Sequence, residues 1–215
     1  MDIQTKVKLL IQYIKSLTDF SFVDYMDGNY CHMGATISDA ILQAGTKYDT
    51  VVRPRIRKIR EIYPEAKTTS AFMELLIKIG PKTILSWSDE EKPNRVVGLT
   101  KFFLREGLET EPDVSAWMEN EENVKRILQV RGVGPKTADY IKILVGCHTA
   151  AVDRHSYTFL NRAGVQVSGY EEALNILNLT ADFLKIDRAL FDHSIWQYMS
   201  RQDKPKSKVP ACKMR

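Results

Sequence analysis

The sequence lacks two features that would each assign it to a class, namely many cysteines and a long apolar run. Its 215 residues contain three cysteines, at positions 31, 147 and 212, which is too few for a disulfide framework and indicates a reducing, intracellular compartment. Three cysteines also cannot supply the four thiolates of an iron–sulfur cluster. No stretch approaches the roughly 20 apolar residues that cross a bilayer, and the first residues, MDIQTKVKLLIQYIK, mix lysines into the apolar ones. We therefore expect neither a membrane segment nor a signal peptide.

Alternation of apolar and polar residues, the pattern of half-buried strands, is almost absent as well. Apolar residues instead recur at the three- and four-residue spacing of amphipathic helices along nearly the whole chain. The fold class that we predict is all-α, in one domain or in two small lobes that share a core. Asp113 is the expected N-cap of a short helix through Trp117, and Gly164 the expected C-cap of a helix that begins after Asp153. The other expected helices lie near 7–17, 37–45, 54–63, 72–79, 96–107, 124–128 and 135–144, with two more between 174 and 196.

The charge balance favours contact with polyanions without proving it. The formal net charge is +4, the isoelectric point is near 8.8, and the basic residues are clustered. One cluster, VVRPRIRKIR, places Arg57 on the polar face of a predicted helix, where it is either a solvated charge or a phosphate contact. The last stretch, DKPKSKVPACKMR (203–215), is polar, basic and interrupted by prolines, which predicts a solvated, mobile tail.

The stretch RGVGPKTADYIK, residues 131–142, has the form of a tight turn between two helices. Gly132 and Gly134 permit backbone conformations that a Cβ atom disfavours, and they let the main chain approach another surface. Pro135 suits the first position of the following helix, whose free amides and dipole form an anion site suited to a DNA phosphate. Such contacts read no base. Lys136, at the same helix start, is either a plain cation or a nucleophile.

A second motif, AAVDRHSYTFLNRAG, places Asp153 seventeen residues after Lys136. By itself Asp153 is most simply a helix N-cap, which contributes about 1 kcal/mol. Taken together, GVGPK-TAD and VDRH at this separation resemble the helix-hairpin-helix DNA glycosylase superfamily, typified by endonuclease III and the 8-oxoguanine DNA glycosylases. The resemblance is sharpest over residues 121–165. It implies two helical lobes with a DNA-binding cleft, which we expect at 30–135, ending in the hairpin, and at 1–29 with 136–215, the basic tail included.

The resemblance also implies roles for the two motifs. Excision of a base leaves positive charge on the sugar, and Asp153 would stabilise that charge and shuttle a proton. Lys136 would attack C1′ of the sugar and form a Schiff base, after which β-elimination cuts the strand. The attacking amine must be neutral, so its pKa must lie well below the free value of about 10.4. The target base must leave the helical stack.

Further DNA contacts are expected from the hairpin and from three residues outside it. Gln43, in ILQAGTKYD, is the candidate for filling the space left by the flipped base, although Gly45 can occupy that position instead. His155, in the first turn after Asp153, either contacts phosphate or packs inside its lobe. The expected DNA-binding residues are Gly132, Val133, Gly134, Thr137, His155, Gln43 and Arg57.

The favoured function is a base-excision-repair glycosylase with AP lyase activity, because the lysine indicates a bifunctional enzyme. The absence of a four-cysteine cluster separates the chain from the endonuclease III branch, and we favour 8-oxoguanine as the lesion. One alternative is a monofunctional glycosylase for alkylated (3-methyladenine-type) or mispaired bases, in which Lys136 only touches phosphate. A second alternative is a non-catalytic helix-hairpin-helix module that grips DNA.

Partners and cofactors follow from the same resemblance. The expected partner is damaged double-stranded DNA, contacted by a monomer in the cytoplasm and nucleoid or in a nucleus. No cofactor is expected to be required, and the four histidines show no metal-ligand spacing. The superfamily's hairpin can hold a monovalent cation, here on main-chain carbonyls around Gly132 and Gly134.

Overall fold

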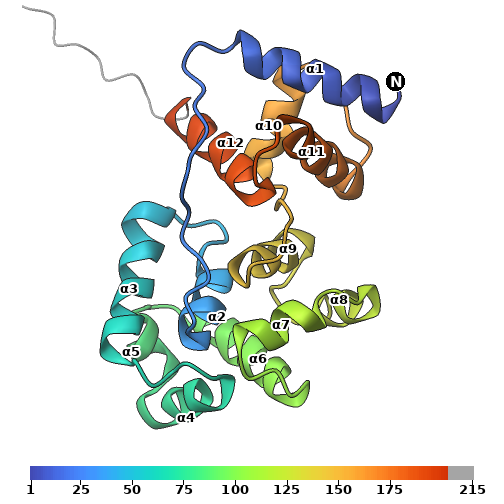
Figure 1. Cartoon of the computed structure of the whole chain (residues 1–215). Helices are drawn as coiled ribbons and strands as arrows, with labels where there is room; N and C mark the ends of the chain where they lie inside the picture. The colour runs from blue at the N-terminus through green and yellow to red at the C-terminus, as the bar shows by residue number, and fades with distance from the viewer. Residues whose placement is uncertain (203–215) are drawn as a thin grey trace, which may run out of the picture. The chain divides into compact units, whose positions relative to one another are not determined.

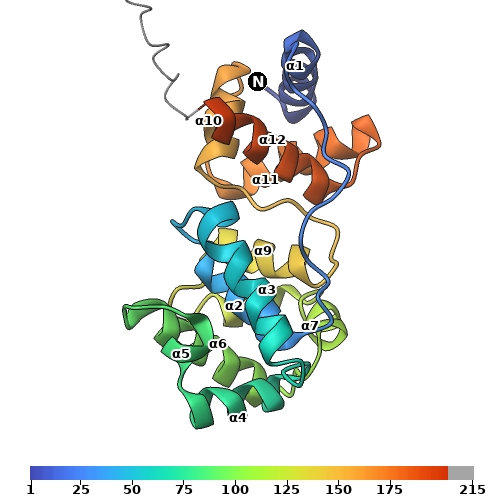
Figure 2. The ribbon, with the colours of Figure 1, turned by 90° about the vertical axis from the view of Figure 1, so that its left-hand side faces the viewer.

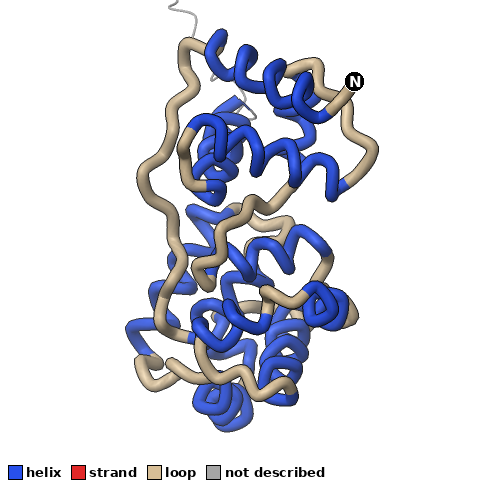
Figure 3. The backbone as a smooth tube through the Cα atoms, turned by 45° about the vertical axis from the view of Figure 1, so that its right-hand side comes forward, coloured by secondary structure: helices blue, strands red, loops and turns tan. Residues whose placement is uncertain are grey.

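The computed structural model describes residues 1–202, and the predicted basic tail at 203–215 lies outside them. The described chain contains helices and loops and no strand (Figure 3), so the predicted all-α class is confirmed. Within residues 1–202, no helix is long and apolar enough to cross a membrane. The helices are α1 Ile3–Ser16, α2 Met33–Leu42, the π-helical η1 Tyr48–Val52, α3 Arg53–Ile62, α4 Thr69–Ile79, α5 Pro81–Leu85, α6 Glu91–Arg105, α7 Glu111–Trp117, α8 Glu121–Ile127, α9 Pro135–Leu144, α10 Arg154–Arg162, α11 Tyr170–Leu184 and α12 Arg188–Gln202.

The chain divides into two compact units. The central unit is Tyr25–Ala151, and the terminal unit combines Met1–Asp24 with the chain from Val152 onward. These boundaries differ from the predicted ones, which lie at 29/30 and 135/136. The main difference arises because α9 follows the hairpin but packs against α2. That contact keeps α9, and the short loop after it, in the central unit.

Helix α2 lies at the centre of the central unit (Figure 1). All ten of its residues are buried, and it contacts α3, α4, α6 and α9. Close packing requires a small residue at Gly34, where a Cβ atom would lie 2.8 Å from Cδ2 of Phe72 and 3.0 Å from Cβ of Ala66. Because α2 is held on several sides, the position of its C-terminal end, at Gln43, is fixed as well.

The terminal unit packs α1 against α11 and α10 against α12 (Figure 2). Its core is aromatic: the ring centroids of Phe20, Phe159 and Tyr198 lie 5.4 to 5.9 Å apart. Between α1 and α11, Lys6 donates a hydrogen bond to Glu172. This bond, together with bonds from Ser168, lowers the pKa of Glu172 to about 2. The unit positions the start of α10, where Asp153 lies.

The helix ends follow local sequence signals, with two corrections, one of which is that the C-cap of α10 is Ala163 and the predicted Gly164 is the residue after it. Asp153 is the N-cap of α10 as predicted, but the predicted N-cap Asp113 is the third residue of α7, whose N-cap is Thr110. The two side chains form a capping box, in which the Thr110 main-chain N–H donates to Oδ2 of Asp113 at 2.8 Å. Two short elements were not predicted. Gly80-Pro81 ends α4 but also opens α5, and η1 has no periodic signal of its own.

Candidate functional site

The hairpin between α8 and α9 has the predicted form, but its two glycines differ. Gly132 has φ +89°, and a Cβ atom there would lie 2.4 Å from Cδ of Arg95. Gly134 has φ −100° and ψ −179°, an extended conformation that any residue adopts, and a Cβ atom there would meet no atom within 4 Å. The predicted conformational need therefore holds for Gly132 and is wrong for Gly134. Between them, Val133 is buried, and its N–H donates to the Val130 carbonyl at 2.9 Å.

We expect Gly132→Ala to lower the free energy of unfolding by about 1–3 kcal/mol, because alanine is strained at positive φ and its methyl group would displace Arg95. Gly134→Ala is the matched control, with an expected change within about 0.5 kcal/mol, since its conformation is ordinary and no atom is met. Urea unfolding followed by circular dichroism measures both. Equal losses in the two variants would contradict this interpretation.

The N-terminus of α9 presents main-chain donors. Gly134 is its N-cap, and no side chain caps the helix there. Pro135 is the first helical residue, so the amides of Lys136 and Thr137 are the first N–H groups of the helix. The side chain of Thr137 is buried, which leaves its main chain as the group available for the predicted DNA contact.

Lys136 and Gln43, predicted separately, lie together. The Lys136 ammonium donates a hydrogen bond to Oε1 of Gln43 and sits 4.8 Å from the ring centroid of Tyr140, one turn further along α9. Gln43 is the C-cap of α2 and is only 9% exposed. Its side chain is therefore turned toward Lys136, whereas Gly45, two residues later, is exposed.

A second lysine, which sequence reasoning missed, holds the same segment. The Lys92 ammonium donates to the carbonyls of Leu42 and Ala44, at 2.6 and 2.8 Å, and to the hydroxyl of Thr46. Partial burial lowers the pKa of Lys92 to about 8. The sequence contains no local signal for this contact, because Lys92 is more than forty residues from its acceptors.

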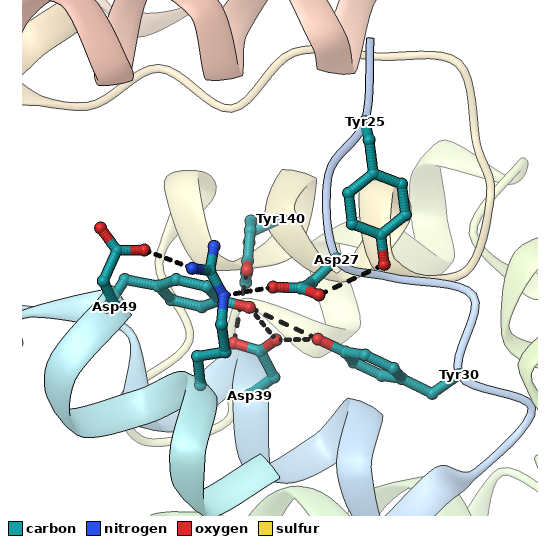
Figure 4. A network of polar contacts seen from close by, with 8 residues as sticks. Tyr25, Asp27, Tyr30, Asp39, Asp49 and Tyr140 are labelled. Carbon is teal, nitrogen blue, oxygen red and sulfur yellow. Dashed lines mark hydrogen bonds and ion pairs between the residues drawn. The ribbon is translucent and has the colours of Figure 1, made fainter. Parts of the chain in front are cut away.

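Beneath Tyr140 lies a buried carboxylate, also missed by sequence reasoning. Asp39, on α2, is fully buried, and the phenols of three tyrosines converge on it (Figure 4). Oδ2 accepts hydrogen bonds from Tyr30 at 2.6 Å and from Tyr48 at 3.0 Å, and Oδ1 accepts one from Tyr140 at 3.3 Å. Burial raises the pKa of Asp39 to about 6, against the opposite effect of the three phenols.

The raised pKa predicts a pH-dependent stability. The folded chain binds the Asp39 proton more tightly than the unfolded chain, so the contribution of Asp39 to stability falls between pH 3.8 and about 6 and is constant above. The stability of the wild type minus that of Asp39→Asn should fall by about 3 kcal/mol across this interval. Other titrating groups are common to both proteins and cancel in the difference. Urea unfolding from pH 3 to 7 measures it, and a flat difference would contradict the assignment.

In the terminal unit, Asp153 closes the first turn of α10. Its Oδ1 atom accepts hydrogen bonds from the main-chain N–H groups of His155, at 2.7 Å, and Ser156, at 3.1 Å, and from the Ser156 hydroxyl. These bonds all reach Oδ1 and leave Oδ2 outside the cap. The His155 side chain is only 7% exposed, which favours packing over the predicted phosphate contact.

The basic run on α3 is divided between two roles. Arg53 pairs with Asp27 and Asp49, each at 2.7 Å, and is therefore committed within the central unit (Figure 4). Arg57 is exposed and lines a groove of about 610 Å³ with Arg60 and Lys67. Of the predicted DNA contacts outside the hairpin, Arg57 has the most accessible side chain.

Comparison with known proteins identifies the fold. No protein-family model matches the sequence, and no curated protein matches it. The 3-methyladenine DNA glycosylase of H. pylori, in a structure with bound 1,N6-ethenoadenine, superposes with a TM-score of 0.50 at 17% identity, over 95% of this chain and 100% of that one. Endonuclease III, in a structure of a trapped covalent intermediate with DNA, gives a TM-score of 0.58 at 16% identity, over 99% of this chain and 92% of that one. The chain thus shares the fold of these two structures, which is the fold that the resemblance of the two sequence motifs implies.

Proposed function

We propose that this protein is a DNA glycosylase of base-excision repair with an associated AP lyase activity. The observation that carries the proposal is the pair of reactive groups at two helix starts. Lys136 lies in the first turn of α9, after the hairpin, and Asp153 caps α10. Both lie in a fold shared with two enzymes described as DNA glycosylases or trapped in covalent intermediates with DNA.

In the proposed reaction, the amine of Lys136 attacks C1′ of a deoxyribose whose base has left the stack. The bond between C1′ and the base breaks, and its electron pair leaves with the base. The sugar ring opens as the nitrogen loses a proton, which gives a Schiff base. Loss of a C2′ proton then breaks the C3′–O bond, and water releases the lysine. The carboxylate of Asp153 stabilises the positive charge that develops on the sugar.

The proposed substrate is damaged double-stranded DNA, held without base-specific contacts. The uncapped amides at the start of α9 would bind a phosphate, with the helix dipole favouring the negative charge. Arg57 would add a second backbone contact, and such binding weakens steeply with salt. The protein would act as a monomer, in the cytoplasm and nucleoid or in a nucleus. It would need no iron–sulfur cluster. The main-chain carbonyls around Gly132 and Gly134 would hold a monovalent cation.

A second candidate, a monofunctional glycosylase for alkylated bases, is favoured by two observations. One structural neighbour is a 3-methyladenine DNA glycosylase. In addition, Lys136 is engaged by Gln43 and Tyr140, as expected of a lysine with a structural role. A non-catalytic DNA-binding module is the third candidate, and it gives Asp153 no role beyond its cap.

One panel of duplexes separates these candidates. Each carries 8-oxoguanine, thymine glycol, a methylated purine or an abasic site, and base release is followed beside covalent trapping by borohydride. The proposal expects trapping together with release, with 8-oxoguanine as the favoured lesion. Release without trapping would establish the monofunctional enzyme. Salt-sensitive binding to undamaged DNA, with neither release nor trapping, would support the module.

A further inference from the structure

Two contacts with the same spacing join α2 to α9. Asp39 and Gln43 are four residues apart on α2, and Lys136 and Tyr140 are four residues apart on α9, so each pair lies on one face of its helix. Asp39 accepts a hydrogen bond from Tyr140 at 3.3 Å, and Gln43 accepts one from Lys136. Asp39, the earlier residue of the pair on α2, thus contacts Tyr140, the later residue of the pair on α9, and Gln43 contacts Lys136 in the opposite order. The amine of Lys136 thus lies at one end of the α2–α9 interface, and the buried Asp39 lies one helical turn away along the same interface.

The ring of Tyr140 connects these two contacts. Its face lies 4.8 Å from the ammonium of Lys136, a distance at which the ring attracts a cation. Its hydroxyl is bound to Asp39, whose other oxygen is held by Tyr30 and Tyr48 (Figure 4). A carboxylate with three phenol donors in a buried helix has no freedom to turn. The ring is therefore anchored at its far end and presents a fixed face to the lysine.

We propose that Tyr140, anchored by Asp39, is a positioning residue that holds the amine of Lys136 at the start of α9. The inference rests on the proposed function, because the position of the Lys136 amine matters only if this amine attacks the sugar. A lysine side chain is long and flexible, and a reaction at its end is slowed unless the amine is held near its target. The ring face and the Gln43 oxygen together restrict the position of the amine.

Three variants test the proposal on a duplex with an abasic site, under single-turnover conditions with borohydride. Tyr140→Leu removes the ring, and the rate of trapping should fall about 10-fold. Tyr140→Phe keeps the ring but frees it from Asp39, and a fall of about 3-fold is expected. Tyr30→Phe is the matched comparison: it removes a phenol from Oδ2 of Asp39, where Tyr48 still donates, and keeps the bond from Tyr140 to Oδ1, so trapping should fall by less than in Tyr140→Phe although stability is lost as well.

A purely structural network would give a different result. In that case Tyr30→Phe and Tyr140→Phe would lower the melting temperature and the trapping rate in parallel, which would overturn the proposal. The maximal trapping rate and the DNA concentration that gives half of it provide a further readout. Loss of positioning in Tyr140→Leu should lower the maximal rate and leave this concentration unchanged, whereas a structural defect would change both.

Failure of this inference is distinct from failure of the proposed function. If the wild type traps, Lys136→Gln does not and Tyr140→Leu behaves as the wild type, the lyase stands and the positioning role is wrong. If the wild type does not trap, the lyase assignment fails and the positioning role falls with it. The NMR signals of the Lys136 side chain, shifted by the ring in the wild type, would then show only whether the contact exists in solution.

Discussion

Asp153→Asn is expected to lower the single-turnover rate of base excision by about 10²- to 10³-fold, the usual effect of removing one electrostatic stabiliser. Asparagine caps a helix as well as aspartate does, so the free energy of unfolding should change by less than about 0.5 kcal/mol. The amide oxygen can still accept the main-chain bonds of His155 and Ser156. The variant therefore removes the charge of Asp153, to which we assign the stabilising role, and keeps the fold.

Asp153→Ala separates the two roles of this residue. It removes the cap and the charge together, so it should lose about 1 kcal/mol of stability in addition to the activity. Base release is followed by chromatography and stability by urea unfolding. A fully active Asp153→Asn protein would reduce Asp153 to a helix cap, and the electrostatic role proposed for its carboxylate would be wrong.

Lys136→Gln is expected to abolish covalent trapping and strand cleavage, by at least about 10³-fold, because no other group replaces the attacking amine. Binding to undamaged DNA should weaken only slightly, as one positive charge is lost near the backbone. The measurement is borohydride trapping on an abasic duplex, with strand cleavage read on a denaturing gel. The same preparation is titrated with DNA to establish that it still binds.

Lys125→Gln provides the control for the lost charge. Lys125 lies on α8, the other helix of the hairpin, and is exposed, with Glu122 at 2.6 Å. Trapping by this variant should equal that of the wild type. If Lys136→Gln released a base at the wild-type rate, the lysine would be a phosphate contact, and the monofunctional candidate would be correct.

The parts of the site that could be predicted from sequence are those that depend on neighbouring residues. Gly132 and Pro135 define a turn and a helix start within a few positions, and Asp153 caps the helix that directly follows it. Physical constraints of this kind act over one helical turn. For the same reason the all-α class follows from the spacing of apolar residues alone.

The parts that could not be predicted depend on packing between distant segments. Tyr30, Asp39, Tyr48 and Tyr140 share no spacing that would associate them, and it is the packing of α9 on α2 that brings Tyr140 to Asp39. The boundary between the two units, at 151/152, also results from the packing of α9 on α2. Gln43 shows the limit most clearly, since its motif predicts contact with DNA and the structure turns it toward Lys136.

The identity of the nucleophile is the central claim, and mapping the trapped adduct tests it most directly. The wild-type protein is trapped on an abasic duplex with borohydride, digested with trypsin and analysed by mass spectrometry. The account predicts an adduct on the peptide 132–142, with cleavage blocked at Lys136. An adduct on Lys92 would contradict it, and so would the absence of any adduct. Lys92 is the informative alternative, because its pKa is lowered to about 8 and its ammonium binds the Leu42 carbonyl, next to Gln43.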